Sequence, residues 1–316
     1  MSDYLIQKAV EFAAVKVGVR KHLGVTSVDE LADSYMAQRK HDGCNAIALV
    51  YPNGCDKILS RTGELVRSCQ HVLTALRQRL AHLLAAGQAF AVLGEVWQPG
   101  TPQSTISGDF RRHGPAPELQ FVVFDIMAAD SFTAGACSTP FEERFRRAAT
   151  LFRGAHPKDT VQLCATYNPG TYGLPQRMAD ELCKASGYDG LILRDPSAGW
   201  VAGSGTTGEI IKVKPVMTLD LRVTGVEEGK GKYAGTLGAL VCKGPKGPVK
   251  VSGMSDAQRD AWWKAALTVP YGSQALDDYM PGRIIEVQCL GITPAGSLRE
   301  PRFKGVRYDK ENADFE

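Results

Sequence analysis

Residues 37–46, AQRKHDGCNA, place Lys40 two residues before Asp42 and three before Gly43, at the start of an apolar run. Such a tetrapeptide arises by chance and is typical of a surface turn. It also suits a lysine that acts as a nucleophile. A lysine attacks only as the free amine, so neighbouring cations or partial desolvation must favour the loss of its proton. The second interpretation predicts further cations and carboxylates at strand ends elsewhere in the chain.

Residues of that kind follow in order along the chain. Each has an ordinary structural explanation when taken alone, as a strand-end charge or as the wet face of an edge strand. Their joint occurrence beside apolar strands favours one site in which cations neutralise the charge on a phosphate. The set comprises Arg61 in SRTGE, Glu95 in LGEVW, Asp125 in VVFDIM, Asp189 and Arg194 in YDGLILRD, and Lys212 and Lys214 in IIKVKP.

Hydrophobic periodicity predicts the elements that must hold these residues. Helical spacing is found in residues 4–15, 69–87, 141–152 and 175–187, the last closed by Gly187. Strand-like runs occupy residues 46–51, 57–63, 90–97, 119–127, 161–166, 190–195 and 209–216. Helices and strands mix without the regular alternation of a parallel sheet, so we expect an α+β fold of mostly antiparallel sheets flanked by helices.

The pattern changes after Pro215. Short strands separated by glycine-rich turns are predicted at residues 219–228, 235–244, 247–253 and 283–292, with one helix at 255–267. A unit of this size and composition is typical of a small β-barrel such as the OB-fold. We therefore predict two domains, residues 1–215 and 216–316.

Composition restricts the class of protein. The formal net charge is only +3, and no run approaches the roughly 20 apolar residues of a membrane span. The amino-terminal segment lacks a signal peptide's apolar core, so we expect a cytoplasmic protein without a membrane partner. The eight cysteines are scattered without zinc-ligand spacing, which indicates reduced thiols.

Positive charge gathers in the second domain. Between Gly229 and Val251 there is no acidic residue but five lysines, namely Lys230, Lys232, Lys243, Lys246 and Lys250. Such a cluster is either a solvated, solubilising face or a surface that follows a phosphate backbone.

The ordered motifs resemble those of the covalent nucleotidyltransferases, and among them the short ATP-dependent DNA ligases of phages and bacteria. KHDG is similar to the KxDG motif of the nucleotidyl-acceptor lysine. The resemblance continues in order through SRTG, LGEVW, FVVFDI, YDGLILRDP, IIKVKP and the tail TPAGSLREPRFKGVRYDK. It covers nearly the whole chain and implies an adenylation domain at residues 1–215, followed by an OB-fold domain.

The resemblance implies a reaction in three steps with ATP and Mg²⁺. Lys40 attacks the α-phosphorus of ATP, the nucleotide passes to the 5′-phosphate at a nick, and the 3′-hydroxyl then seals the strand. Catalytic roles are implied for Lys40, Asp42, Lys212 and Lys214. Nucleotide contacts are implied for Gln38, Arg39, Lys40, Arg61, Glu95, Phe124, Asp189, Arg194, Lys212, Lys214, Arg307 and Lys310, and metal contacts for Glu95 and Asp189.

Three positions depart from the family pattern. Asp189 stands where glutamate is usual, Gln38 stands where glutamate is frequent, and Asn45 replaces a common arginine. The implied partner is nicked duplex DNA, bound by a monomer through the OB face and the five lysines with a steep dependence on salt.

Other classes remain open at this point. RNA ligases and mRNA-capping guanylyltransferases share the lysine chemistry. An OB protein that only binds nucleic acid would not need Lys40.

Overall fold

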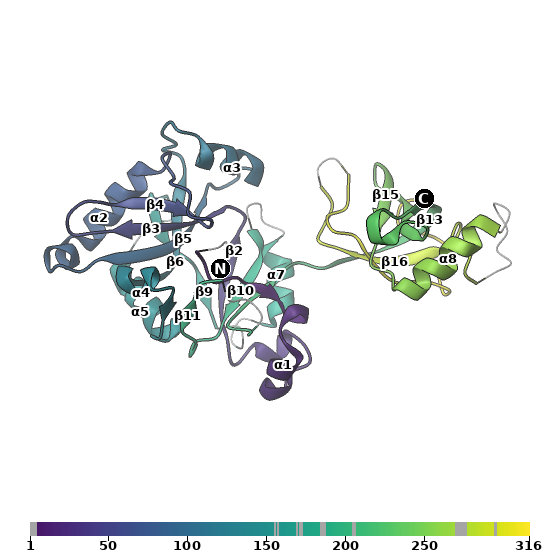
Figure 1. The fold of residues 1–316 in the computed structure, drawn as a ribbon, viewed down its shortest axis with the longest axis horizontal. Helices are drawn as coiled ribbons and strands as arrows, with labels where there is room; N and C mark the ends of the chain where they lie inside the picture. The colour runs from purple at the N-terminus through teal and green to yellow at the C-terminus, as the bar shows by residue number, and fades with distance from the viewer. Residues whose placement is uncertain are drawn as a thin grey trace. The chain divides into compact units, whose positions relative to one another are not determined.

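The computed structural model describes residues 5–154, 156, 158–168, 170, 173–183, 188–203, 207–268, 277–293 and 296–316. Backbone contacts group the chain into two compact units, Met1–Lys214 and Pro215–Glu316. Figure 1 shows the ribbon of both, and each unit is described by itself.

The described part of the first unit contains two five-stranded sheets. One has the order β4-β3-β5-β6-β8 and the other the order β1-β12-β10-β2-β9. Neighbouring strands run antiparallel except β1 with β12 and β6 with β8, which confirms the predicted fold class. The strands are β1 Val10–Glu11, β2 Met36–His41, β3 Cys44–Val50, β4 Lys57–Ser60, β5 Phe90–Trp97, β6 Gln120–Ala128, β8 Val161–Leu163, β9 Thr166–Tyr167, β10 Tyr188–Arg194 and β12 Ile210–Val213. Two short strands, β7 Ala136–Cys137 and β11 Trp200–Val201, pair with each other.

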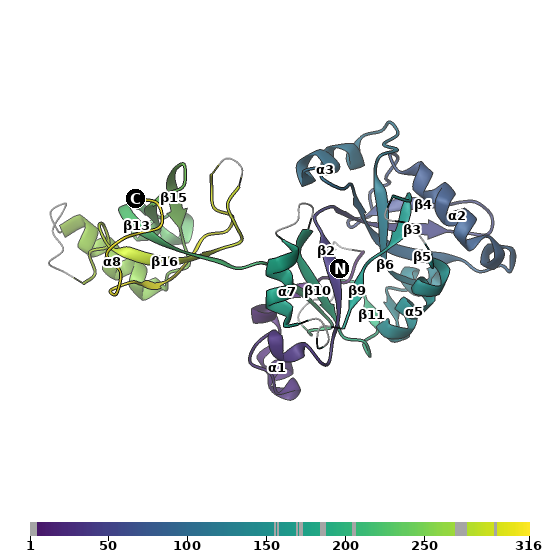
Figure 2. The ribbon, with the colours of Figure 1, turned by 180° about the vertical axis from the view of Figure 1, so that it is seen from behind.

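Helices cover the faces of these sheets (Figure 2). Helix α2, Gln70–Ala85, packs Val72, Leu76 and Leu80 against the β4-β3-β5-β6-β8 sheet, as its periodicity predicts. Helix α5, Phe141–Leu151, contacts β6, and helix α7, Pro175–Leu182, contacts β10. Gly187, predicted to close the last helix, lies outside the described residues. The unit also contains α1 Val17–Leu23, η2 Asp29–Leu31, α3 Gln103–Arg111 and α4 Ala129–Thr133.

The amino-terminal prediction is wrong. In place of the helix predicted over residues 4–15, the described residues 5–15 form β1 followed by the short 3₁₀ turn η1, Phe12–Ala14. Val10 and Glu11 pair with Ile211 and Lys212 at the edge of β12. The exposed edge of β12 offers backbone partners that an isolated amphipathic segment lacks, so tertiary pairing overrides the helical period.

A bulge in β10 determines what faces β2. Tyr188 pairs with His41 and Leu191 with Arg39, so two residues, Asp189 and Gly190, lie opposite the single Lys40. Gly190 has a φ of +111°, and a Cβ there would lie 2.0 Å from the carbonyl oxygen of Val213. Glycine is therefore required beside Asp189 by both backbone conformation and space.

The second unit is a barrel-like sheet of order β15-β14-β13-β16-β17 over one apolar cluster. Phe303 donates its backbone N–H to the carbonyl of Ser252 at 2.7 Å, which joins the segment after β15 to β17. Strand β17 was not predicted from the sequence. The elements are β13 Met217–Glu228, η3 Gly231–Tyr233, β14 Leu237–Gly244, β15 Gly247–Val251, α8 Asp256–Thr268, β16 Ile284–Cys289 and β17 Arg302–Val306.

None of the helices in the described ranges combines the length and apolar content that a membrane crossing requires.

Candidate functional site

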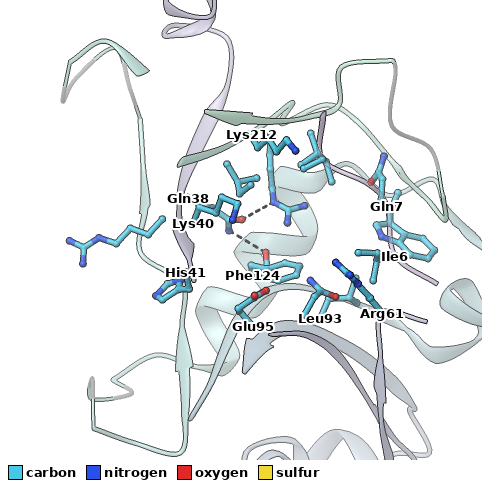
Figure 3. Close-up of a pocket in the computed structure, with 17 residues that line it drawn as sticks. Ile6, Gln7, Gln38, Lys40, His41, Arg61, Leu93, Glu95, Phe124 and Lys212 are labelled. Atoms are coloured by element: carbon cyan, nitrogen blue, oxygen red, sulfur yellow. Dashed lines mark hydrogen bonds between the residues drawn. The ribbon is translucent and has the colours of Figure 1, made fainter. Parts of the chain in front are cut away.

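A cavity of about 260 Å³ receives residues from both sheets of the first unit. Figure 3 shows Lys40, Arg61, Glu95, Phe124 and Lys212 around this cavity, which we call the lysine cavity. Its wall brings together eight residues predicted from the sequence, namely Gln38, Arg39, Lys40, Arg61, Glu95, Phe124, Arg194 and Lys212. Residues separated by up to 174 positions in the chain therefore meet at one place, which a set of unrelated surface turns does not explain.

Lys40 lies on β2, and its Nζ is 2.7 Å from Oδ2 of Asp189. The lysine side chain is 24% exposed and the aspartate 8%, so the pair is reachable from solvent mainly on the lysine side. Asp189 does not line the cavity itself but orients the amine that does. The shorter side chain of aspartate, compared with glutamate, is sufficient for this contact.

Gly43 allows β2 and β3 to turn tightly against β5. A Cβ at this position would lie 2.3 Å from the carbonyl oxygen of Val96. The register then pairs Asn45 with Glu95, which lines the cavity beside Lys40. Burial raises the pKa of Glu95 to about 7, although Lys40 and hydrogen bonds from Asn45 and the Gly43 backbone act in the opposite direction.

The wall formed by Phe124 is fixed by a buried polar chain. Nε2 of Gln38 donates to the carbonyl oxygen of Phe124 at 3.2 Å, and Nε of Arg194 donates to Oε1 of Gln38 at 2.7 Å. The guanidinium of Arg194 lies 4.8 Å from the centre of the Phe124 ring and 4.9 Å from that of Phe141. Burial lowers the pKa of Arg194 to about 10, still far above neutral pH, so this guanidinium remains charged.

Asp125 has a structural role. It is fully buried, and both of its carboxylate oxygens accept hydrogen bonds from Arg144 at 2.9 Å. The pair holds β6 against α5, behind the Phe124 wall.

An aromatic cluster surrounds the residues on either side of Lys40. The guanidinium of Arg39 lies over Tyr167 and Tyr188 at 5.5 and 5.3 Å, and His41 contacts Trp97 and Tyr188 edge-on. Burial lowers the pKa of His41 to about 4, so its ring is neutral at physiological pH. The cluster therefore restrains the backbone of β2 beside Lys40. Because the His41 ring is neutral, it adds no positive charge next to the lysine at physiological pH.

Sequence reasoning missed the amino-terminal residues Ile6, Gln7 and Ala9, which line the cavity. Leu5 donates its N–H to the carbonyl of Arg61 at 2.9 Å, and Ile6 accepts from Gly203 at 2.8 Å, so this segment is tied across the site. No motif marks it, and its helical periodicity predicted a different structure. His41 and Trp200 also line the cavity and were missed. Asn45, identified from the sequence only as a departure from the family pattern, lines it too.

Several predicted residues lie elsewhere. Asp42 and Lys214 do not line the lysine cavity, although both lie next to elements that do. In the second unit, Arg307 and Lys310 both contact Asp220, at 3.1 and 2.8 Å. Of the five lysines, Lys250 pairs with Glu227 at 2.5 Å, and Lys232 lies over the Tyr233 ring; Lys230, Lys243 and Lys246 complete the set on the same unit.

The chemistry of the donors fits a hard divalent cation that keeps water and phosphate ligands. Among the described residues there is no group of three or more His, Cys, Asp or Glu side chains that could hold a metal alone. Two carboxylates, Glu95 and Asp189, lie near Lys40. Mg²⁺ is commonly bound by one or two carboxylates together with substrate phosphates, so this pair suits it once a nucleotide is present.

Comparison with known proteins agrees with the motif resemblance. Residues 228–307 match the family model described as DNA ligase OB-like domain. A probable DNA ligase of Mycolicibacterium paratuberculosis is 27% identical over 96% of this chain and 59% of its own length. Mycobacterial relatives of the same description are covered over only 49% of their length, so the chain spans between about half and three fifths of these curated relatives.

Two solved structures share the fold along almost the whole chain. One comes from work on DNA binding with a minimal scaffold by Lig E DNA ligases, with a TM-score of 0.57, 19% identity, and coverage of 96% of this chain and 98% of that one. The other is the ATP-dependent DNA ligase of bacteriophage T7 in complex with ATP, with a TM-score of 0.50, 20% identity, and coverage of 96% and 98%. The predicted plan of antiparallel sheets with helices, followed by an OB-like domain, is confirmed.

Proposed function

We propose that this chain, similar along nearly its whole length to ATP-dependent DNA ligases, uses ATP to seal nicks in duplex DNA. One observation carries the proposal. Lys40 reaches a cavity in which three arginines, a second lysine and a partly buried glutamate converge from both sheets, beside an aromatic ring suited to a nucleobase. That combination matches the needs of a lysine that accepts a nucleotide.

In the first step, the Lys40 amine forms a bond to the α-phosphorus of ATP, the bond to pyrophosphate breaks, and the lysine loses its proton. Asp189 holds Nζ in position before the nucleotide binds. Lys212 and Arg61 lie on the same cavity and neutralise charge on the phosphate oxygens. Phe124, fixed from behind by Arg194, offers its ring to adenine, with Gln38 at its edge.

Mg²⁺, when bound, neutralises phosphate charge and lowers the repulsion met by the leaving pyrophosphate. Glu95 and Asp189 are the residues of this chain that would hold it. Arg307 and Lys310 are proposed to contact the same leaving group, in keeping with their positions in the tail motif TPAGSLREPRFKGVRYDK. The lysines from Lys230 to Lys250 are proposed to contact DNA phosphates.

The second and third steps need no further nucleophile from the protein. The nucleotide moves from Lys40 to the 5′-phosphate of the nick, and the 3′-hydroxyl then displaces AMP. We further propose that the protein is a monomer of a reducing, cytoplasmic compartment, in keeping with its eight free cysteines. Gel filtration with light scattering tests the first part of that statement.

Radioactive ATP labelled at the α-phosphate tests the function. We expect a protein adduct that disappears when nicked DNA is added, with label released as AMP and the strand sealed. K40A should form no adduct, whereas K57A, which removes an exposed lysine outside the site, should behave as wild type. Discharge only onto nicked RNA, or only onto a diphosphate RNA end, would instead favour an RNA ligase or a capping enzyme. Absence of any adduct with ATP on wild-type protein contradicts both ligases, and the same assay with GTP labelled at the α-phosphate tests the capping enzyme.

A further inference from the structure

A second cavity, of about 730 Å³, adjoins the lysine cavity, and only part of its wall comes from the motifs. The two cavities share Lys40, Asn45, Arg61 and Glu95 in their walls. The remainder of the second wall comes from the segment after β4 and from helix α3, which the sequence analysis did not predict. A ligand in this second cavity therefore has access to the same lysine as a bound nucleotide.

The wall carries an excess of positive charge. Its cations are Lys40, Arg61, Arg67 and Arg111, against two carboxylates, Glu64 and Glu95. Arg67 and Arg111 are exposed, and neither forms an ion pair with a carboxylate anywhere in the part of the chain that the structure describes. His113 adds an imidazole ring, which can donate an N–H, to the same wall. Two uncompensated guanidiniums at one cavity are suited to phosphate oxygens.

Two hydrogen bonds join the walls that carry these arginines. Oγ of Ser68 donates to the carbonyl of Phe110 at 2.8 Å, and Ala116 donates its N–H to the carbonyl of Ser68 at 2.9 Å. Ser68 is fully buried and Phe110 nearly so. Because Arg67 precedes Ser68 and Arg111 follows Phe110, the two guanidiniums extend from backbones that are fastened together. The two backbones are thus held together before any ligand arrives.

Apolar surface lies beside the charge. Leu65 is 54% exposed on this wall, and the buried ring of Phe110 contributes to it as well. A free inorganic anion cannot bury this apolar surface, whereas the sugar and base next to a backbone phosphate can pack against it.

We propose that the second cavity binds the phosphate-bearing end of the polynucleotide that accepts AMP from Lys40, with Arg67 and Arg111 holding its backbone. This inference rests on the proposed function and adds residues outside the motifs to it. Arg67 and Arg111 then serve the transfer to DNA rather than the reaction with ATP.

The double variant R67Q/R111Q tests this assignment, with R146Q as the matched control. Arg146 is an exposed helical arginine that lines neither cavity, so its loss changes net charge without touching the site. Two measurements are made: equilibrium binding of nicked duplex by fluorescence anisotropy without ATP, and discharge of purified lysyl-AMP protein onto that duplex. Thermal melting shows that each variant is folded.

We expect R67Q/R111Q to bind nicked duplex about tenfold more weakly near physiological salt, and the slope of log K against log salt to shrink by about two. Discharge should slow by a similar factor. R67K/R111K, which keeps both charges, should recover most of the slope, and R146Q should match wild type.

Wild-type binding, slope and discharge in R67Q/R111Q would overturn the inference, as would equal losses in R146Q. These outcomes differ from a failure of the proposed function. Fluorescence anisotropy measures DNA binding without adduct formation. If the wild-type protein forms no lysyl-AMP, the comparison of DNA binding between wild type and R67Q/R111Q still tests the inference.

Discussion

At the scale of single residues, the contact between Lys40 and Asp189 links the proposed nucleophile to a carboxylate that is one methylene shorter than the usual glutamate. Asp189 lies in a bulge, which brings its Oδ2 within 2.7 Å of the lysine nitrogen. The backbone displacement at the bulge thus compensates for the shorter side chain of aspartate.

D189N keeps the shape of this side chain but removes its charge. We expect lysyl-AMP formation to slow about a hundredfold, because the amine loses its orienting charge and Mg²⁺ loses one of its proposed ligands. D189E, which restores charge with a longer reach, should recover part of the rate. Single-turnover adduct formation measures both, and a D189N rate within threefold of wild type would contradict the role.

Glu95 gives stability a pH dependence of definite sign. Its pKa in the folded protein is raised from 4.5 to about 7, so between these values the folded state holds more protons than the unfolded state. The contribution of protonated Glu95 to the free energy of unfolding is complete below about pH 4.5 and is lost as pH rises through 7. E95Q has no such group, so from pH 5 to pH 8 wild type should lose about 2 kcal/mol relative to E95Q.

Urea unfolding of both proteins at each pH measures this difference. The comparison cancels His41, whose lowered pKa acts with the opposite sign but is present in both proteins. A gap between the two proteins that does not change with pH would show that Glu95 is ionised throughout.

At the residue scale, the sequence predicts the site residues whose chemical type the reaction requires. It misses the residues that reach the site only through the pairing of distant segments. Lys40, Glu95 and Lys212 were identifiable because their types and order are unusual beside apolar strands. Gln7 was not, since the residues around it repeat with helical spacing. Pairing with the free edge of β12 and the backbone hydrogen bonds of Leu5 and Ile6 hold that segment at the site.

At the scale of elements, strands with buried faces were predictable and polar elements were not. Helix α2 and strands β5 and β6 have long apolar patterns, so periodicity found them. Helix α3, with sequence QSTISGDFR, buries only Ile106, Ser107 and Phe110, which is too short a pattern to recognise. Strand β17, RFKGV, has two charged residues and a glycine among its five positions, and its pairing with β16 defines it.

Two glycine substitutions separate backbone constraint from helix propensity. G190A places a Cβ against the carbonyl of Val213 in a left-handed conformation, so we expect a loss of about 2–4 kcal/mol in unfolding free energy together with displacement of Asp189. G108A lies in α3 with open space around it and should gain about 0.5–1 kcal/mol. Chemical denaturation measures both, and equal effects of the two changes would refute the assigned constraint.

At the scale of the whole molecule, two units with separate cores divide the proposed work. The first carries Lys40 and both cavities, and the second carries the OB-like domain with Arg307 and Lys310. The sequence indicated this division through the change from mixed elements to short strands with glycine turns. It could not indicate how Asp220 joins Arg307 to Lys310, because that contact spans 87 residues.

Fragments 1–214 and 215–316 test the division. Each should melt cooperatively, because each buries its own apolar cluster. Fragment 1–214 should still bind ATP but form lysyl-AMP about a hundredfold more slowly, since Arg307 and Lys310 are absent. Calorimetry and adduct formation measure these results. An undiminished rate in fragment 1–214 would exclude the proposed role of the second unit.

The tryptophans provide an intrinsic optical readout. Trp200 lines the lysine cavity and Trp97 touches His41, whereas Trp262 and Trp263 belong to the core of the other unit. Emission from the first pair should therefore change when a nucleotide enters, with no dye attached. W262F/W263F would silence the background and leave a protein whose fluorescence follows that entry in real time.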